Sequence, residues 1–221
     1  MEKRLIDYDD LSRKDKIDHI WEYYKLHIIG GIIGAMMLFW VLNHYIFNPP
    51  ADIVFDLSIF TYAMDTEKSD ALTDELSALV SDDLKREVAA IESFNIEEGI
   101  DYNMQMANVT KIMGKSTLGD FDILVFVGEN YSRYLDQGMM KPLDDYIEKG
   151  LITLPEDNYY TAKELGATTE EIKSDSIYLV DVTELPMFEG MLPEGETYYM
   201  GIFSNQDNEE NIAKVLQYMF E

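Results

Sequence analysis

The segment Leu26–Phe47 constrains this chain more than any other feature, because none of its 22 residues is Lys, Arg, Asp or Glu. Elsewhere charges are frequent, and 27% of all residues are charged. A helix of about 22 residues rises roughly 33 Å, which matches the roughly 30 Å hydrocarbon core of a bilayer. A helix also satisfies its own backbone hydrogen bonds in lipid. The segment 26–47 therefore predicts a transmembrane helix, and the lipid bilayer is an expected partner of this chain.

The positions of the basic residues predict the orientation of this helix. Six Lys and Arg precede it, and the first one after it is Lys68. Basic residues that flank a span stay in the cytoplasm, whereas acidic residues contribute little. We therefore expect a cytoplasmic tail with a juxtamembrane amphipathic segment at 1–25. Residues 48–221 are then an extracellular domain of a single-pass cell membrane protein.

A cleaved signal peptide is the alternative to a membrane anchor. Its apolar region would span about 7–15 residues and end in small residues at the cleavage site. The run in this chain is longer and ends in the bulky residues 43–47. These features favour an uncleaved signal anchor. The chain contains no Cys, which excludes a lipidated cysteine anchor and, for an exported domain, favours a bacterial source.

The charge of the chain is concentrated in the outer domain. Eleven of the 17 Lys and Arg and 36 of the 43 Asp and Glu lie in residues 48–221, which carry a formal charge of −25. Such a field repels nucleic acid and anionic lipid headgroups. It favours cations, cationic peptides or a basic protein surface, although solubility alone also explains an acidic composition.

Hydrophobic periodicity predicts the elements of the outer domain. Five runs of β-branched and aromatic residues predict strands: 53–62, 90–96, 121–127, 178–182 and 197–203. Apolar residues at helical spacing predict three helices, through Leu72, Leu76, Leu79, Val80 and Leu84, through Tyr102, Met106, Val109 and Met113, and through Ile212, Val215, Leu216 and Met219. The alternation predicts one small α/β domain with a mostly parallel five-stranded sheet flanked by helices, preceded by one transmembrane helix.

The fold class predicts where a ligand would bind. In open α/β sheets, ligands lie beyond the carboxyl ends of the strands. Two predicted strands end there in residues that can contact a ligand: Phe60, Thr61 and Tyr62, and Gly128, Glu129, Asn130 and Tyr131. Helix N-terminal amides at 128–131 could hold a small polar group, although an ordinary turn explains the same sequence.

The outer domain lacks the residues that most catalytic sites need. All three His lie before residue 48, and there is no Cys, so Ser-His and Cys-His pairs and His or Cys zinc sites are excluded there. Carboxylates remain, but no spacing defines a glycosidase pair or a calcium loop. We therefore expect no enzyme, no metal and no cofactor, with a carboxylate-based hydrolase as a distant alternative.

A family resemblance is carried by residues 121–150 and by the C-terminal segment. The segment Asp122-Ile123-Leu124-Val125, followed by Gly138 and by Pro142-Leu143-Asp144-Asp145-Tyr146-Ile147, resembles the first lobe of bacterial extracellular solute-binding proteins. The ending YYMGIFSNQDNEENIAKVLQYMF resembles the late strand and the helix that packs against that lobe in the family. The resemblance implies a type II periplasmic-binding-protein-like lobe. Complete members have a second lobe, which is almost absent from this sequence.

These observations lead to one favoured function and one alternative. A truncated lobe on a membrane anchor predicts an accessory or interaction protein that docks onto another membrane or surface protein, for which a transporter is one candidate. The alternative is a solute- or peptide-capture protein with a reduced second lobe. Within the span, the small residues Gly30, Gly31, Gly34 and Ala35 have the spacing that allows close helix approach, and thus a homodimer.

The predicted topology can be tested on intact cells. Protease added outside should remove the acidic domain, because residues 48–221 are expected in the external medium. Immunoblotting with tags at both ends would follow the products. Survival of the domain in intact cells, together with its digestion after lysis, would contradict this orientation.

Overall fold

The computed structural model describes residues 12–47, 49–95, 99, 101–167 and 172–221, apart from the side chains of residues 13, 15, 19 and 20. The chain forms two compact units, Met1–Pro50 and Ala51–Glu221. Residues 1–11 of the predicted cytoplasmic segment and residue 48 lie outside the described residues.

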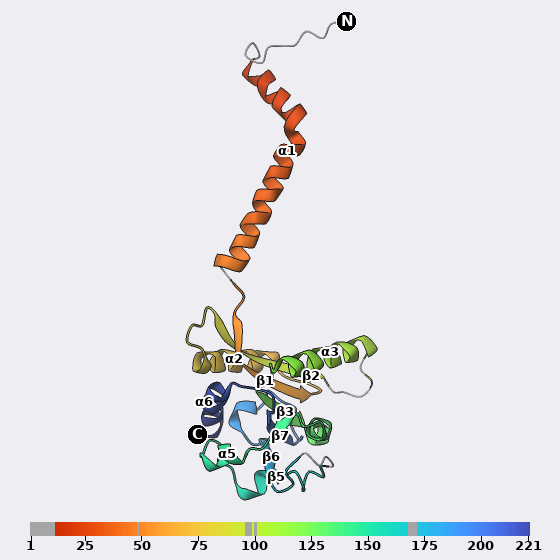
Figure 1. Ribbon diagram of the computed structural model, residues 1–221, viewed down its shortest axis with the longest axis vertical. Helices are drawn as coiled ribbons and strands as arrows, with labels where there is room; N and C mark the ends of the chain where they lie inside the picture. The colour runs from red at the N-terminus through yellow and green to blue at the C-terminus, as the bar shows by residue number, and fades with distance from the viewer. Residues whose placement is uncertain (1–11, 48, 96–98, 100, 168–171) are drawn as a thin grey trace. The chain divides into compact units, whose positions relative to one another are not determined.

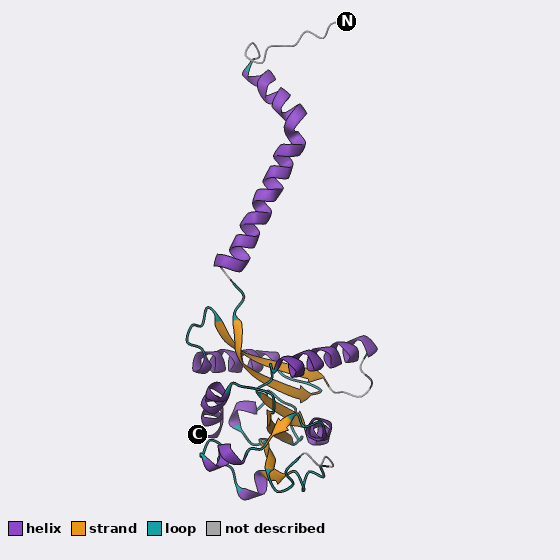
Figure 2. Cartoon of the chain, viewed as in Figure 1, coloured by secondary structure: helices purple, strands orange, loops and turns teal. Residues whose placement is uncertain are grey.

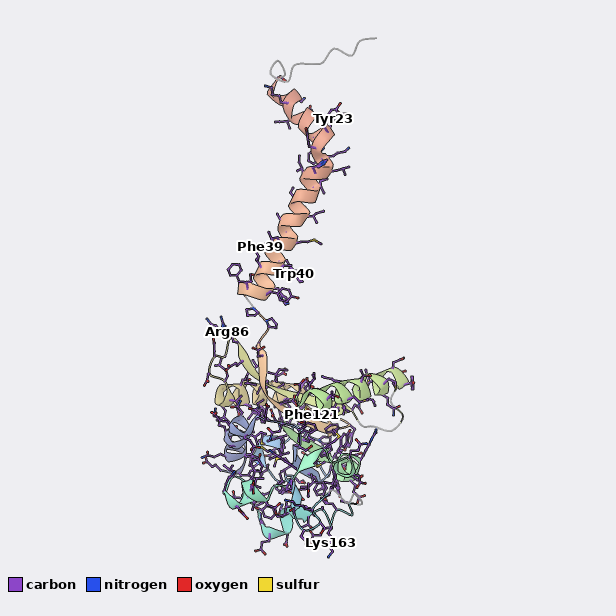
Figure 3. All side chains as sticks on the ribbon, in the orientation of Figure 1. Tyr23, Phe39, Trp40, Arg86, Phe121 and Lys163 are labelled. Atoms are coloured by element: carbon purple, nitrogen blue, oxygen red, sulfur yellow. The ribbon has the colours of Figure 1, made fainter. Side chains whose placement is uncertain are left out.

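The first unit contains the predicted apolar helix. Helix α1 (Arg13–Leu42) continues into a π-helical segment, η2 (Asn43–Phe47). Its stretch Trp21–Phe47 is long and apolar enough to cross a membrane. Large side chains such as Phe39 and Trp40 project from the helix and are exposed (Figure 3). This is the surface expected of a helix whose solvent is lipid.

The second unit is an α/β domain in which helices surround a sheet (Figures 1 and 2). The strands are β1 (Asp52–Thr61), β2 (Glu87–Asn95), β3 (Ile123–Val127), β4 (Met140–Lys141), β5 (Tyr159–Thr161), β6 (Ile177–Asp181) and β7 (Tyr198–Phe203). The α-helices are α2 (Thr66–Val80), α3 (Tyr102–Leu118), α4 (Ser132–Asp136), α5 (Asp144–Glu148) and α6 (Glu209–Phe220). Short 3-10 turns are η3 (Gly128–Tyr131), η4 (Glu156–Asn158) and η5 (Pro186–Phe188).

The sheet is mixed, so the prediction of a mostly parallel five-stranded sheet is wrong. Its seven strands have the order β2-β1-β3-β7-β6-β5, with β4 beside β7. Among the described residues, the pairs β1–β2 and β1–β3 are parallel, and the other pairs are antiparallel. A parallel connection needs a crossover of a dozen or more residues, usually a helix. Helices α2 and α3 provide such crossovers, whereas α4 and α5 have five residues each.

One face of the sheet is covered by α2 and α6 in the way that their periodicity predicts. Alternate residues of β1, including Leu57 and Ile59, lie in one buried cluster with Leu76 of α2 and Leu216 of α6. Helix α2 ends at Val80, however, and Leu84 lies in the following turn and is exposed. The predicted extension of this helix to Leu84 is therefore wrong. The helix ends because the residue that follows it, Ser81, has an extended backbone conformation.

The other face carries a cluster of aromatic rings. Phe60 stacks against Phe94 of β2, with 5.1 Å between ring centroids, and against Phe126 of β3, with 4.8 Å. Helix α3 lies on this face, and its Ile112 packs against the same cluster. None of the 17 residues of α3, all of which the structure describes, is buried. The aromatic rings of the strands are nevertheless buried on this face, since Phe60 and Phe126 are fully buried.

Candidate functional site

The parallel pairing of β1 and β3 brings the two predicted ligand-binding segments to one edge of the sheet. Phe60 is the register partner of Phe126, so Thr61 and Gly128 follow at neighbouring strand ends. Phe60 and Thr61 are buried, and the Thr61 hydroxyl donates a hydrogen bond to the Ala63 carbonyl at 3.1 Å. These two side chains therefore serve the core and the turn.

The remaining predicted ligand residues have varied surroundings. The Gly128 amide donates to the Thr197 carbonyl at 2.8 Å, and the Asn130 side-chain amide donates to the Val127 carbonyl at 2.7 Å. Tyr131 is buried against Tyr199, edge to face at 5.2 Å. Tyr62, Glu129 and Asn130 are exposed.

These seven residues lie outside four hollows on the surface of the described part of the chain. Burial raises the pKa of Tyr199 to about 12. The Tyr62 hydroxyl contacts Glu196 at 3.1 Å, in a separate loop. This edge of the sheet is thus filled by aromatic rings and turn hydrogen bonds.

A polar cluster lies on the same face of the sheet, beneath the C-terminal half of α3. Alternation along β1 places Asp56 and Ser58 on the face that carries Phe60. Asp122 directly precedes β3, and Glu92 belongs to β2. Helix α3 contributes Lys111 and Lys115, and Asn208 precedes α6. Three elements, β1, β2 and α3, and the residues that precede β3 and α6 therefore meet at this cluster.

Lys115 is the centre of the charged part of the cluster. Its ammonium pairs with the carboxylate of Asp56 and with Glu92 Oε2, the latter at 3.1 Å. The side chains of Lys115 and Asp56 are 12% and 2% exposed. Lys111 also contacts Glu92, at 3.0 Å. The Lys115 ammonium lies 4.9 Å from the centroid of the Phe121 ring, within cation–π range (Figure 3 labels Phe121).

The protonation equilibria of these carboxyls follow from burial and from the two lysines. Burial raises the pKa of Asp56, and the Lys115 ammonium opposes part of that rise. Burial acts in the same direction on Glu92, but hydrogen bonds from Lys111 and Lys115 hold its pKa below the usual value. Glu92 is therefore the more firmly ionised partner of Lys115.

Asp122 connects three elements through hydrogen bonds. Its Oδ2 accepts from the Asp56 backbone N–H at 2.8 Å and from the Asn208 side-chain amide at 3.0 Å. The amides of Asn208 and Asn211 both donate to the Val54 carbonyl, at 2.7 and 2.9 Å. Burial raises the pKa of Asp122 to about 6 even though its hydrogen bonds favour the ionised form. Asp122 thus ties β1, β3 and the start of α6 together.

A hollow of about 820 Å³ borders this cluster. It is lined by carboxylates together with Lys111, Lys115, Asn208 and Asn211. In the described part of the chain, no three His, Asp or Glu side chains are grouped as metal ligands would be. The expected lack of a metal and a cofactor stays a prediction. The buried polar groups of the cluster already form ion pairs and hydrogen bonds with one another. These interactions hold α3 and the start of α6 against the sheet.

The sequence motifs do not predict this polar cluster, although the sequence of β1 indicates a buried polar site. In IVFDLSIF, Asp56 and Ser58 interrupt an apolar run and lie on one face. Buried carboxylates need a partner, so an ion pair with a Lys of a covering helix could have been expected. The sequence pattern places Asp122 only in the strand motif that carries the family resemblance.

The small residues of the apolar helix lie on its surface. A Cβ added at Gly30, Gly31 or Gly34 would meet no atom within 4 Å in the described part of the chain, and Ala35 is exposed. The surface is open to a second helix, and the homodimer through this helix stays a prediction.

Comparison of the chain with protein-family models, with curated proteins and with solved structures yields no match.

Asp122 should make stability depend on pH. Its pKa is about 6 in the folded protein and 3.8 in the reference state. The folded state binds this proton more tightly, so Asp122 stabilises the fold most below pH ~4, and the contribution is lost as the pH rises through ~6. The difference corresponds to about 3 kcal/mol. Asp122→Asn, which keeps an acceptor oxygen, should remove this part of the pH dependence.

The measurement is urea unfolding of the full chain in detergent micelles at several pH values from 4 to 7, followed by tyrosine fluorescence. The difference between wild type and variant isolates Asp122 from the other carboxyls. Asp120→Asn, at an exposed position of the same loop, is the control. An Asp122→Asn variant with the wild-type pH profile would contradict the assignment.

Proposed function

We propose that this chain is a single-pass, membrane-anchored accessory protein that presents a solute-binding-like lobe outside the cell. Its role is to dock onto another membrane or surface protein, and a transporter is the partner class that the resemblance favours. The N-terminus is cytoplasmic and the domain Ala51–Glu221 is extracellular in this proposal. The helix Trp21–Phe47, which is long and apolar enough to span a bilayer, supports the anchor.

The arrangement of the last strand and helix supports the resemblance to a solute-binding lobe. Strand β7 pairs with β3, the strand of the "DILV" motif. Helix α6 buries Ile212 and Leu216 in the cluster that also holds Leu57 of β1. The C-terminal segment thus returns to the first strands, as the late helix of the family does.

The single observation that carries a docking role is the path of the chain between β3 and β7. In a two-lobed binding protein, a segment of this kind would leave for the second lobe. Here β5 and β6 rejoin the same sheet, and the described residues of Ala51–Glu221 form one compact unit. A ligand that needs two closing lobes has no second wall among these residues. A lone lobe is better suited to contact a protein surface than to enclose a solute.

The charge of the domain indicates the chemistry of the partner. A formal charge of −25 on residues 48–221 attracts basic surfaces and accelerates encounter with them. The same charge opposes binding to nucleic acid and to anionic headgroups. A partner with Lys and Arg on its docking surface is therefore favoured.

The docking role predicts a protein partner and no small ligand. Lysine-reactive crosslinking of the tagged full-length protein in its native membranes should yield a product that contains a second membrane or surface protein. A ligand at 100 times its Kd would stabilise the domain by about 2.7 kcal/mol. We therefore expect no shift in melting temperature with amino acids, a casein digest or oligosaccharides.

A monomer-only crosslinking pattern together with a ligand-dependent rise in melting temperature would contradict this function and favour solute capture. The matched control is the same protein with the substitution Lys163→Gln, which removes one ammonium group. Lys163 is exposed, so losing one reactive amine should not remove the product.

A further inference from the structure

Helix α3 lies on the sheet with a mixed polar and apolar side inward, and its half-buried residues are Asn108, Val109, Ile112, Lys115 and Ser116. Lys115 bonds Asp56 and Glu92, and the Asn108 side-chain amide donates to the Asn95 carbonyl at 3.1 Å. Ile112 is the one large apolar side chain of α3 that packs against the aromatic cluster among the described residues. An ordinary surface helix would turn its apolar stripe toward the core. Helix α3 is held mainly through ion pairs and hydrogen bonds.

The large apolar side chains of α3 are consequently exposed. These side chains lie on two flanks of the helix. We call Tyr102, Met106 and Met113 the outer face of α3, because at about 100° per residue they lie within about 40° of one another around the helix axis. They are 70%, 45% and 64% exposed, and the exposed residues Met104 and Leu118 lie on the opposite flank. The predicted helical spacing of Tyr102, Met106 and Met113 is thus correct, but these residues do not contribute to the core. Figure 3 shows side chains projecting from α3 away from the strands.

The contrast with α2 and α6 shows that, among the long helices described in the second unit, this exposure is specific to α3. Leu72 and Leu76 of α2 and Ile212 and Leu216 of α6 are buried. Single exposed apolar residues are common, but a group of them on one element marks an interaction surface. Methionine suits such a surface, because its flexible thioether adapts to varied partners. The ion pairs beneath α3 hold the helix in place before any partner binds, so little ordering is needed on binding.

We propose that the outer face of α3 docks a protein whose contact surface is apolar and flanked by Lys or Arg. The proposal rests on the docking role described above and names the surface and partner chemistry for it. Charge complementarity selects this occupant. A second copy of the domain carries the same −25 and is repelled, and an anionic lipid surface is repelled for the same reason. An apolar protein surface flanked by Lys or Arg can pack against the exposed side chains of α3 and is attracted by the negative charge of the domain.

Photocrosslinking from α3 tests this proposal in the full-length protein in its native membranes. Benzoylphenylalanine is placed at Met113 in one variant and at Leu84 in the control. Leu84 is an apolar residue that is 61% exposed and lies outside α3. After irradiation, the product is digested and the crosslinked peptide of the partner is sequenced.

The proposal predicts a product with a different polypeptide from position 113, at least tenfold stronger than from position 84. The crosslinked partner segment should contain apolar residues with neighbouring Lys or Arg, and 0.5 M salt should lower the yield several-fold. A dimer of this chain as the sole product, a lipid adduct alone, an acidic partner segment, or no product would overturn the proposal.

A double variant, Met106→Ser/Met113→Ser, separates docking from folding. Both side chains are exposed, so the melting temperature should stay within about 2 °C of wild type, as for ordinary surface substitutions. Recovery of the lysine-crosslinked partner should fall at least tenfold. Unchanged recovery would show that another surface docks the partner, which overturns the α3 assignment and leaves the docking role intact. Absence of a partner from the wild-type protein as well would contradict both.

Discussion

The pairing of Lys115 with Asp56 and Glu92 determines how α3 lies on the sheet. Removing charges from water costs several kcal/mol per ion, and only close pairing with additional hydrogen bonds offsets that cost. Asp56 has such a bond, because Ser58 Oγ donates to it at 2.6 Å. Rotating α3 to bury Met113 would leave Asp56 buried without its cation. We infer that the ion pair specifies the rotation of α3 more than it adds stability.

This rotation connects the buried chemistry of the domain with its surface. Because the sheet face beneath α3 carries carboxylates, the helix turns Lys115 inward, and Met106 and Met113 then face solvent. In the proposed docking role, the negative charge of residues 48–221 would oppose contact of this face with copies of the same chain or with anionic membranes. A membrane anchor would add to this by holding the domain at the surface where a membrane-bound partner is concentrated.

Elements whose patterns reflect local burial could be predicted from the sequence. The apolar run at Ile123–Val127 is a central buried strand, and α6 buries Ile212, Val215 and Leu216. Strand direction could not be predicted from such runs, because a buried strand such as Tyr198–Phe203 has the same composition in either direction. The orientation of α3 depends on Asp56 and Glu92, which reach it from two other elements. Because its residues come from separate elements, the polar cluster has no local sequence motif.

The most direct test of this account is the solvent accessibility of individual methionine methyl groups in the full-length protein. NMR of methyl-labelled protein in zwitterionic nanodiscs, with a soluble paramagnetic agent, reports it residue by residue. The account predicts strong relaxation of Met104, Met106 and Met113 and weak relaxation of Met140, Met191 and Met200, which are at most 4% exposed. Protection of the α3 methionines at the level of Met200 would mean that the helix is rotated, which would contradict the central claim.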